Sequence, residues 1–539
     1  MPFTNAQLEI RVGNVESLLV GPAPTDLLDR TLNPHLAGVS SGSRAVVYDP
    51  ARQAFLSGAL PQVKRLLRQH GFRCRLRDRR RTRGRRFSWR VRGATLRDYQ
   101  RKTVRAALAR GRGLIDVGTG GGKTLLAAEV IARLSRPTLV LVTTRALLVQ
   151  TVRHLRRWLN VEPGVIGEGE WRISPLTVAL VQSLRRRLHN DVVDLSPWHG
   201  GTLVFDEGHH AAATTYVELI RAIDPCYAYY LSAVPFRAGA DQIVLDALAG
   251  ERLTGGRYAA RYLIDHGYAC PVEVRIERCR IDGAMAEKPF DEIYREFIVE
   301  NVARNERIAS IARGETALGR SVLVLVDRVR HGEILQRRLQ GRDKRAGSEN
   351  SRDAVGFVHG GTAKRRLRRA IDRFAAGELS CLIATSQLLA EGISIDRIEV
   401  LVQAGGLKSR AKLIQAIGRG VRCAPGKSTC LFVDFWDDDE AGVLRAHSRQ
   451  RLAVLKAEGF RVPDAPPRER LALLEDDVPA SWAHVPRSKR FLLIGADGTI
   501  RAKAECVDRR PVPKRLCEKC NDPSLCHTGG RISWREHPD

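Results

Sequence analysis

Short runs of apolar, largely β-branched residues recur along this 539-residue chain, and segments with helical spacing separate them. Such runs predict strands buried on both faces, and their alternation with helices is typical of a parallel sheet covered on both sides. The first series of predicted strands comprises residues 114–117, 137–142, 177–181, 202–205 and 228–232. A second series comprises residues 322–326, 354–358, 381–385, 399–402 and 430–434. We therefore predict an α/β protein with two parallel-sheet lobes in tandem.

The chain on either side of these lobes has other patterns. Residues 45–50 predict a strand that runs into a turn, residues 60–70 have helical spacing, and residues 72–77 alternate apolar and basic positions as in a half-exposed strand. A charged helical stretch and a proline-rich linker at 462–467 precede a small tail. The predicted domains are a basic α+β domain at 1–92, lobes at 93–263 and 264–440, and a helical extension with a cysteine-containing tail at 441–539.

Charge narrows the classes of partner. Lys and Arg total 89 against 60 for Asp and Glu, which gives a formal net charge of +29. Such a chain attracts polyanions and releases counterions when it binds them, although an arginine-rich proteome would also raise the total. No apolar run approaches the ~20 residues needed to span a bilayer, and the N-terminus lacks the pattern of a signal peptide. The 11 cysteines are thinly spread, so we expect reduced thiols in a cytoplasmic protein with no membrane partner.

The densest cluster of like charge closes the N-terminal domain. Residues 79–86 pack positive charges too closely to fold alone, so we predict a basic hairpin tip or loop that nucleic-acid phosphates order. A solvated linker is the alternative. The predicted phosphate contacts are Arg79, Arg80, Arg81, Arg83, Arg85 and Arg86. They make residues 1–92 a candidate nucleic-acid-binding domain.

Residues 117–124 follow the first predicted strand of the first lobe and open a helix, which is the setting of a phosphate-binding loop. Glycines allow backbone N–H groups to turn toward phosphate oxygens. Lys123 would reach the β- and γ-phosphates of ATP, and Thr124 would ligate Mg²⁺. Val117 stands where the general motif has Gly. The predicted cradle comprises Gly118, Thr119, Gly120, Gly121, Gly122, Lys123 and Thr124.

An acidic pair after a later strand supplies the other groups that nucleotide hydrolysis needs. Asp206 and Glu207 follow the predicted strand at 202–205, and carboxylates at strand ends face the crevice of an open α/β sheet. Asp206 would hold Mg²⁺, Glu207 would polarise the attacking water, and His209 would link this loop to its neighbours. Alone, such a pair is often a helix cap, but here it follows a phosphate loop in the same predicted sheet.

These elements together resemble the DExH-type helicases of superfamily 2. The resemblance is closest to the branch of xeroderma-pigmentosum-B-like helicases and motor subunits of type I and III restriction enzymes. It covers residues 93–440 and implies two RecA-like lobes with ATP between them. By resemblance, Arg97 and Gln100 bind the adenine, Thr143, Thr144, Arg145, Gln182 and Ser183 contact the nucleic-acid backbone, and Ser232 and Ala233 couple hydrolysis to strand separation. Val234 replaces the threonine that most relatives carry in the coupling motif.

The second lobe carries the motif with the clearest physical requirement. Charge develops on the γ-phosphoryl oxygens during hydrolysis, and a guanidinium group from the other lobe stabilises it. By resemblance, this motif supplies Gln415, Arg419 and Arg422, and the two arginines share a helix face at i, i+3. The resemblance also implies track contacts at His359, Gly360, Thr385 and Ser386, and a place near ATP for Gly392. Taken alone, His359 is more typical of a packed core or capping histidine.

Cysteines cluster near the end of the chain. Cys517 and Cys520 have the CxxC spacing that presents two thiolates to one metal ion. The other candidate zinc ligands are Cys506, Cys526 and His527. Reduced thiols in a polar tail are the alternative. For the acidic run at 437–440, we predict a solvated helix start and not a metal site.

The motifs predict an ATP-dependent DNA helicase or translocase that uses ATP and Mg²⁺ in repair, recombination, phage replication or defence. Closure of the lobes on ATP and their opening after hydrolysis would move the protein along a backbone without reading its sequence. An RNA helicase and an ATP-gated nucleic-acid-binding scaffold subunit are alternatives, and the intact Glu207 argues against the scaffold. No nuclease motif is evident, so cutting would require a partner protein. We expect a nucleoid-associated enzyme that prefers DNA to RNA.

Overall fold

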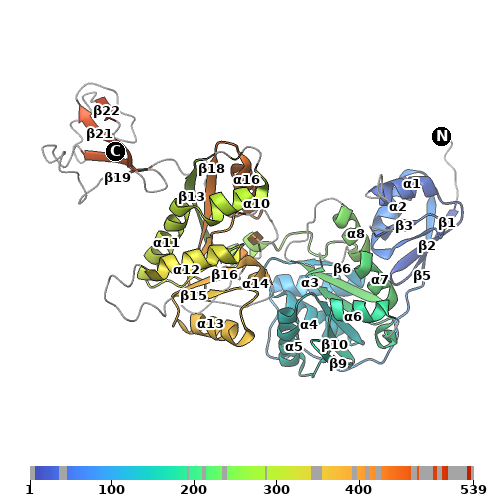
Figure 1. The fold of residues 1–539 in the computed structure, drawn as a ribbon. Coiled ribbons are helices and arrows are strands. Elements are labelled where there is room, and N and C mark those ends of the chain that lie inside the picture. The colour runs from blue at the N-terminus through green and yellow to red at the C-terminus, as the bar shows by residue number, and fades with distance from the viewer. Residues whose placement is uncertain are drawn as a thin grey trace. The chain divides into compact units, whose positions relative to one another are not determined.

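The computed structural model (Figure 1) describes residues 7–34, 45–190, 193–208, 214–232, 240–283, 285, 288–341, 355–390, 397–406, 413–414, 416–418, 427–462, 470–472, 490–494, 500–507 and 531–535. Contacts within the chain divide it into two compact units. The first comprises Met1–Pro271 with Leu388–Ser394 and Ala411–Cys423, and the second comprises Val272–Gln387, Ile395–Arg410 and Ala424–Asp539.

A small mixed sheet with two helices begins the first unit. Its elements are β1 (Gln7–Val12), β2 (Glu16–Val20), α1 (Thr25–Leu32), β3 (Tyr48–Asp49), β4 (Ala54–Leu56), α2 (Leu60–Gln69) and β5 (Arg73–Asp78). The strand order is β3-β4-β2-β1-β5, with β5 parallel to β1 and the other neighbours antiparallel. The predicted helix at 60–70 is present and buries Val63 and Leu67. The edge strand β5 is more exposed than its alternating pattern predicts, because Leu76 is 44% exposed.

The first lobe is a seven-stranded sheet in the same unit. Its strands are β6 (Arg112–Asp116), β7 (Thr138–Val142), β8 (Gly164–Gly167), β9 (Glu170–Arg172), β10 (Leu176–Leu180), β11 (Thr202–Asp206) and β12 (Tyr227–Ser232). The order is β6-β12-β11-β7-β10-β8-β9, and all neighbours are parallel except β8 and β9. The α/β fold and the five predicted strands are confirmed, with small shifts at the strand ends.

Helices cover both faces of this sheet (Figure 1). They are α3 (Asp98–Arg110), α4 (Lys123–Leu134), α5 (Arg145–Leu159), α6 (Val181–His189), α7 (Thr214–Ile223), α8 (Ala240–Ala249) and α9 (Ala260–Asp265). Leu139 and Leu141 of β7 belong to one apolar cluster with residues of α6, α7 and α8. Val140 and Val142 are also buried, and strand geometry turns them to the opposite face. Burial on both faces explains the continuous apolar runs of the sequence.

The N-terminal sheet and the first lobe share an apolar core. Gly58 approaches α8 so closely that a Cβ atom at this position would lie 2.4 Å from the carbonyl oxygen of Ala247. Asn14 Nδ2 donates to Asp224 Oδ2 at 3.0 Å, and the guanidinium of Arg112 donates to the carbonyl of Asn14. The N-terminal domain is therefore packed on the lobe.

The second unit contains a six-stranded sheet in which all neighbours are parallel. Its strands are β13 (Val272–Ile281), β14 (Val322–Val326), β15 (Val355–Val358), β16 (Cys381–Thr385), β17 (Val400–Gln403) and β18 (Cys430–Asp439), in the order β13-β18-β17-β14-β16-β15. The associated helices are α10 (Phe290–Tyr294), α11 (Val302–Ala317), α12 (Val329–Gly341), α13 (Lys364–Ala376), α14 (Ser386–Ala390) and α16 (Val443–Ala457). A π-helical turn, Arg295–Val299, continues α10. The pattern of strands predicted this lobe but not its edge strand β13.

The first three residues of the acidic run at 437–440 lie in a strand and only Glu440 is exposed, so the prediction of a solvated helix start is wrong. β18 ends at Asp439, whose carboxylate accepts from Val443 N–H and Arg445 N–H at the start of α16. Asp437 is 1% exposed. Arg304 of α11 donates to Asp437 at 2.7 Å, and Arg451 of α16 pairs with Asp434 at 2.9 Å. Buried carboxylates are tolerated only when they are paired and hydrogen-bonded, and these two arginines supply the partners.

Four antiparallel strands are described in the C-terminal region. They are β19 (Arg470–Ala472), β20 (Arg490–Ile494), β21 (Ile500–Val507) and β22 (Arg531–Arg535). None of the helices in the described ranges combines the length and the apolar character that a membrane span requires.

Candidate functional site

The carboxyl ends of the first-lobe strands bring the predicted site residues of this lobe to one edge of the sheet. Parallel strands in register end together. The paired positions at this edge are Asp116 with Ser232, Leu231 with Asp206, Phe205 with Leu141, and Val142 with Leu180. The phosphate loop, the acidic pair and the two backbone-contact motifs all leave the sheet here. This edge is where open α/β sheets bind ligands.

The loop between β6 and α4 has the backbone geometry of a phosphate cradle. Gly120 and Gly122 have φ angles of +81° and +76°, which L-residues with side chains rarely adopt. At Gly118 and Gly121, added Cβ atoms would lie 2.7 Å from Ala260 N and 2.3 Å from Val117 Cγ1. Side chains at these glycines would therefore collide with the start of α9 and with the first residue of the loop. The amine of Lys123 donates back to the carbonyl of Val117 at 3.4 Å.

Two side chains of α3 brace this loop by hydrogen bonds to its backbone. Tyr99 Oη and Gln100 Nε2 both donate to the carbonyl of Gly121, at 2.7 and 3.0 Å. Burial raises the pKa of Tyr99, so its hydroxyl remains a donor. Gln100 Oε1 accepts from the backbone N–H of Arg97 at 2.9 Å, and Gln100 is 3% exposed. One polar end of Gln100 therefore braces the loop and the other caps the start of α3, roles that the predicted adenine contact does not include.

The groups around the loop fit a nucleotide phosphate and a divalent cation. Thr119 Oγ1 is buried and has no hydrogen-bond partner among the described residues. Backbone N–H groups at the start of α4 point out of the helix, and the helix dipole favours an anion there. Thr124 lies in the first turn of α4, and Asp206 ends β11. Hydroxyl and carboxylate oxygens are the ligands that Mg²⁺ prefers.

The acidic pair at the end of β11 contains an unusual backbone conformation. Glu207 has a φ angle of +53°, and its N–H donates to Asp206 Oδ1 at 3.0 Å. A non-glycine residue in this region costs about 1–3 kcal/mol, and such residues concentrate at active sites. The turn directs the chain away from the sheet immediately after the strand, and Gly208 follows against Tyr230.

A segment from the second half of the sequence reaches the same loop. Residues 416–418 belong to the first compact unit, and Ile417 is buried. Gly418 lies so close to Thr119 that a Cβ atom on Gly418 would be 2.4 Å from Thr119 Cγ2. Arg419, the next residue in the chain, lies outside the described residues.

Comparison with known proteins agrees with this arrangement. Residues 93–237 match the model of the type III restriction enzyme res subunit, and residues 303–424 match the helicase conserved C-terminal domain. The chain carries a superfamily 2 helicase motor. The helicase is accordingly an ATP-dependent enzyme.

Three curated relatives are similar to the helicase over about two thirds of its length. The putative DNA 3'-5' helicase Rad25 of Halobacterium salinarum is 30% identical, over 69% of this chain and 58% of its own. The DNA 3'-5' translocase XPB2 of Sulfurisphaera tokodaii is 26% identical, over 61% of this chain and 78% of its own. The probable helicase D10 of Escherichia phage T5 is 25% identical, over 67% of this chain and 75% of its own.

A solved structure supports the fold alone. The ATP-dependent type ISP restriction-modification enzyme LlaBIII bound to DNA aligns with a TM-score of 0.51 and 14% identity, over 68% of this chain and 30% of that one.

The predicted track residues of the first lobe of the helicase lie at loops and helix starts. Thr144 is the N-cap of α5, where its side chain accepts from Leu147 N–H at 3.3 Å. Gln182 Nε2 donates to the carbonyl of Thr143 at 3.0 Å, so these two motifs touch. Arg145 pairs with Glu168 at 2.5 Å. Ser183 follows Gln182 in α6, and Ser232 is buried at the end of β12.

In the second lobe of the helicase, the predicted track residues also follow strand ends. Thr385 ends β16 and Ser386 begins α14, where Ser386 Oγ donates to the carbonyl of Val326 at 3.3 Å. His359 follows β15, and its Nδ1 accepts from Gly361 N–H at 3.2 Å. This local turn matches the capping alternative for His359. Gly360 is exposed beside it.

Several predicted residues lie outside the described part of the helicase. They are His209, Ala233, Gly392, Gln415, Arg419, Arg422, Cys517, Cys520, Cys526 and His527. Of the candidate zinc ligands, only the backbone of Cys506, in β21, is described. No cluster of three or more His, Cys, Asp or Glu side chains suited to a metal ion occurs among the described residues.

Residues 79–86 form a loop, which is one of the two predicted forms, and the hairpin tip is wrong. These residues form the first part of an extended segment, residues 79–92, which we call the strap. Backbone hydrogen bonds tie the strap to the N-terminal sheet and to the first lobe, so phosphate is not needed to order it. The bonds run from Arg79 N–H to Val12 O (2.8 Å), Arg83 N–H to Gly200 O (3.2 Å), Phe87 N–H to Ser135 O (2.9 Å) and Arg92 N–H to Trp158 O (2.8 Å). The side chains of Arg79, Arg80, Arg81, Arg83, Arg85 and Arg86 are exposed.

One carboxylate and one cluster of aromatic rings beside the loop were not identified from sequence. Asp116, the last residue of β6, is 4% exposed and pairs with Arg252 at 2.8 Å, which fixes the segment that packs on Gly118. The guanidinium of Arg97 lies 4.4 Å from the ring centroid of Tyr268. The surrounding rings are those of Tyr99, Tyr258, Tyr262 and His266. Residues 258–268 are unusually rich in aromatic residues for a chain with 6% aromatics, and this local density was the signal that could have revealed the cluster.

Proposed function

We propose that the helicase is an ATP-driven DNA translocase that unwinds duplex DNA. The observation that carries this proposal is the meeting of the glycine cradle and the pair Asp206–Glu207 at one edge of one sheet. Relatives named as DNA 3'-5' helicases and translocases support DNA as the track. Repair, recombination, phage replication and defence are the proposed settings, and they would place the enzyme at the nucleoid.

The residues at this edge have separate tasks in ATP hydrolysis. Backbone N–H groups of the loop and Lys123 hold the phosphates in line, and Glu207 orients and deprotonates the attacking water. Thr124 and Asp206 would hold Mg²⁺, which would neutralise charge on the phosphates. The strained turn at Glu207 fixes the carboxylate where it must act, without a rearrangement during the reaction.

The arginine fingers Arg419 and Arg422 are proposed to stabilise charge on the γ-phosphoryl group. The place of Gly418 against Thr119 supports this role, because one peptide unit separates Gly418 from Arg419. Gln415 and Gly392 are proposed to line the same nucleotide. Arg97 and the ring of Tyr268 are proposed to hold the adenine, since a guanidinium and an aromatic ring offer a flat surface for stacking.

Movement is proposed to follow from alternating grips by the two lobes. Thr143, Thr144, Arg145, Gln182 and Ser183 would contact the strand backbone in the first lobe. The second-lobe contacts would be His359, Gly360, Thr385 and Ser386. Because such contacts reach phosphates and sugars, binding would tolerate any base sequence. His209, Ser232 and Ala233 would transmit the nucleotide state to the track.

The remaining assignments are proposals of the same kind. The domain limits are 1–92, 93–263, 264–440 and 441–539. Zinc would be held by Cys517 and Cys520 with ligands from Cys506, Cys526 and His527. A nuclease or another subunit would supply any cutting activity.

The test is the ATPase rate of the full chain with no polymer, single-stranded DNA, duplex DNA or RNA, for wild type and Glu207→Gln. Strong stimulation by DNA that the substitution abolishes is the expected result. Stimulation by RNA alone would replace DNA with RNA as the track. Binding without stimulation by any polymer would overturn the motor and favour the scaffold subunit.

A further inference from the structure

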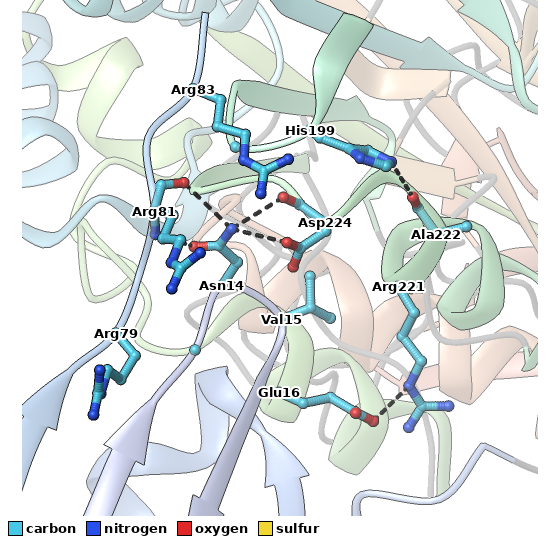
Figure 2. Close-up of a pocket in the computed structure, with 12 residues that line it drawn as sticks. Asn14, Val15, Glu16, Arg79, Arg81, Arg83, His199, Arg221, Ala222 and Asp224 are labelled. Carbon is cyan, nitrogen blue, oxygen red and sulfur yellow. Dashed lines mark hydrogen bonds and ion pairs between the residues drawn. The ribbon is translucent and has the colours of Figure 1, made fainter. Parts of the chain in front are cut away.

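A cavity lies at the opposite edge of the first-lobe sheet from the phosphate loop. It has a volume of about 490 Å³ and opens between the N-terminal sheet and the lobe (Figure 2). Gly200 lines it just before β11, and Asp224 lines it just before β12. Both positions precede the strands whose far ends carry the acidic pair and Ser232. The cavity therefore belongs to the amino edge of the sheet.

Three alternate residues of the strap line this cavity: Arg79, Arg81 and Arg83. In extended chain, alternate side chains point the same way and recur about every 6.6 Å. Arg80 points elsewhere and pairs with Asp78 at 2.7 Å. Figure 2 shows the three guanidinium groups along one side of the cavity. They form a ladder of charges on one face of the strap.

The acidic groups of the cavity are already engaged. Asn14 Nδ2 donates to Asp224 Oδ2 at 3.0 Å, and Glu16 pairs with Arg221 and with Arg52, both at 2.9 Å. None of the three ladder arginines has an ion-pair partner among the residues that the structure describes. The neutral amide of Asn14 leaves the charge of Asp224 in place, so the cavity offers three guanidinium groups against one carboxylate, and guanidinium groups suit phosphate oxygens well.

The ladder is held in position by its backbone. Asn14 Oδ1 accepts from Arg81 N–H at 3.1 Å, and Asn14 Nδ2 also reaches the carbonyls of Arg81 and Asp224 at 3.4 and 3.2 Å. Gly200, with a φ angle of +67°, lies so close that an added Cβ atom would be 2.6 Å from Arg81 O. Asp224 has a φ angle of +44°. Three unusual local arrangements therefore seat the strap, while its charged side chains remain exposed.

We propose that this cavity is a second DNA-binding site, which holds backbone phosphates of a DNA segment other than the strand on the motor track. The proposal rests on the proposed function. The five-residue strands of the sheet span about 17 Å, so a single phosphate group cannot contact both edges. A branched or forked DNA offers two separate stretches at once. Binding at both edges raises affinity by effective concentration without any change at the track.

The experiment compares full-length wild type with the triple variant Arg79→Gln, Arg81→Gln and Arg83→Gln. A matched control carries Arg30→Gln, Arg65→Gln and Arg68→Gln, which removes the same charge from exposed positions on α1 and α2 of the same domain. Fluorescence anisotropy measures affinity for a forked duplex and for a short single strand at several salt concentrations. The ATPase rate with the short single strand is measured in parallel.

The pocket variant is expected to bind the fork at least tenfold more weakly, and its salt dependence should fall by about three released counterions. Its affinity for the short single strand and the ATPase stimulation by that strand should stay within twofold of wild type. The control should lose less than threefold on the fork. Retained single-strand stimulation also shows that the pocket variant is folded.

Two results would overturn the second site. An equal loss in pocket and control variants would mean that general charge, and not the cavity, attracts the fork. An equal loss on fork and single strand would mean that the ladder is part of the motor track. If wild type itself shows no stimulation by any polymer, the proposed function fails, and that result is distinct from either of these.

Discussion

The two edges of the first-lobe sheet present positive groups in different ways. At the carboxyl edge, the groups are backbone N–H donors in a glycine loop with one lysine, and the loop is braced by Tyr99 and Gln100. At the amino edge, they are three flexible guanidinium groups on the strap. A site that performs chemistry needs donors that are fixed before the reaction. A site that only holds a polyanion needs positive charge and must accept any base sequence. The contrast supports catalysis at one edge and grip at the other.

The largest expected effect separates the edges most cleanly. Glu207→Gln should lower the ATPase kcat by about 10²–10⁴-fold, because the amide cannot accept a proton from water. Fork binding in the absence of ATP should not change. Glu170→Gln, an exposed carboxylate of β9, is the matched control and should leave kcat within twofold. If the two variants hydrolyse ATP equally well, Glu207 is not the base.

Two glycine substitutions should have opposite effects, one on ATP binding and the other on fork binding. Gly122→Ala forces a side chain into a left-handed backbone and toward Gln100 Nε2 at 2.7 Å, whereas Gly200→Ala pushes on the strap at Arg81 O. We expect Gly122→Ala to raise the KM for ATP about tenfold with fork affinity kept, since the backbone cost is roughly 1–2 kcal/mol. Gly200→Ala should weaken fork affinity and leave the KM for ATP unchanged. Steady-state kinetics and anisotropy measure both, and parallel losses in one variant would contradict separate edges.

Asn14→Ala tests whether the strap must be held in place for the ladder to work. All arginines remain, but the four hydrogen bonds that the Asn14 side chain makes with Arg81 and Asp224 are lost. Fork affinity should weaken about threefold to tenfold, because a lost hydrogen bond costs roughly 0.5–1.5 kcal/mol and only part of the lost seating is felt at the arginine side chains. Asn190→Ala, an exposed position after α6, is the control. An unchanged fork affinity would mean that the ladder does not depend on its seat.

The smallest expected effect has the opposite sign. Glu168→Gln removes the exposed partner of Arg145, and surface ion pairs of this kind contribute about 0–1 kcal/mol. Arg145 would then be available to a phosphate, so affinity for a short single strand should rise about twofold. Fork-specific binding through the cavity should not change. Reduced single-strand affinity would show that Arg145 does not contact the track.

The chemistry of the carboxyl edge was predictable from sequence because it is local. A phosphate loop needs glycines and a lysine at fixed spacing after a strand, and an acidic pair needs a strand before it, so residues 117–124 and 202–207 carry their own evidence. Parallel sheets then require that these strand ends meet at one edge. The pattern of strands predicted both lobes for the same reason.

The amino edge was not predictable because its contacts are distant in sequence. The seat of Arg81 depends on Asn14 and Gly200, which lie 67 residues before it and more than 100 after it. The dense basic run therefore predicted phosphate contacts in a hairpin tip or loop, but not their place at this edge of the sheet. The acidic run at 437–440 misled for the same reason, since Asp437 takes its partner, Arg304, from 133 residues away. Charges that pair over such separations look solvated in a sequence.

The strap also determines how the molecule would bear a mechanical load. Its backbone hydrogen bonds to Val12, Gly200, Ser135 and Trp158 lie at intervals along an extended chain and point across it. Tension applied along such a segment loads these bonds together, in shear, whereas a hairpin tip pulled outward would open one bond after another. If the motor pulls one DNA segment at the carboxyl edge while another is held at the amino edge, the strap would therefore resist the pull as a stiff connection.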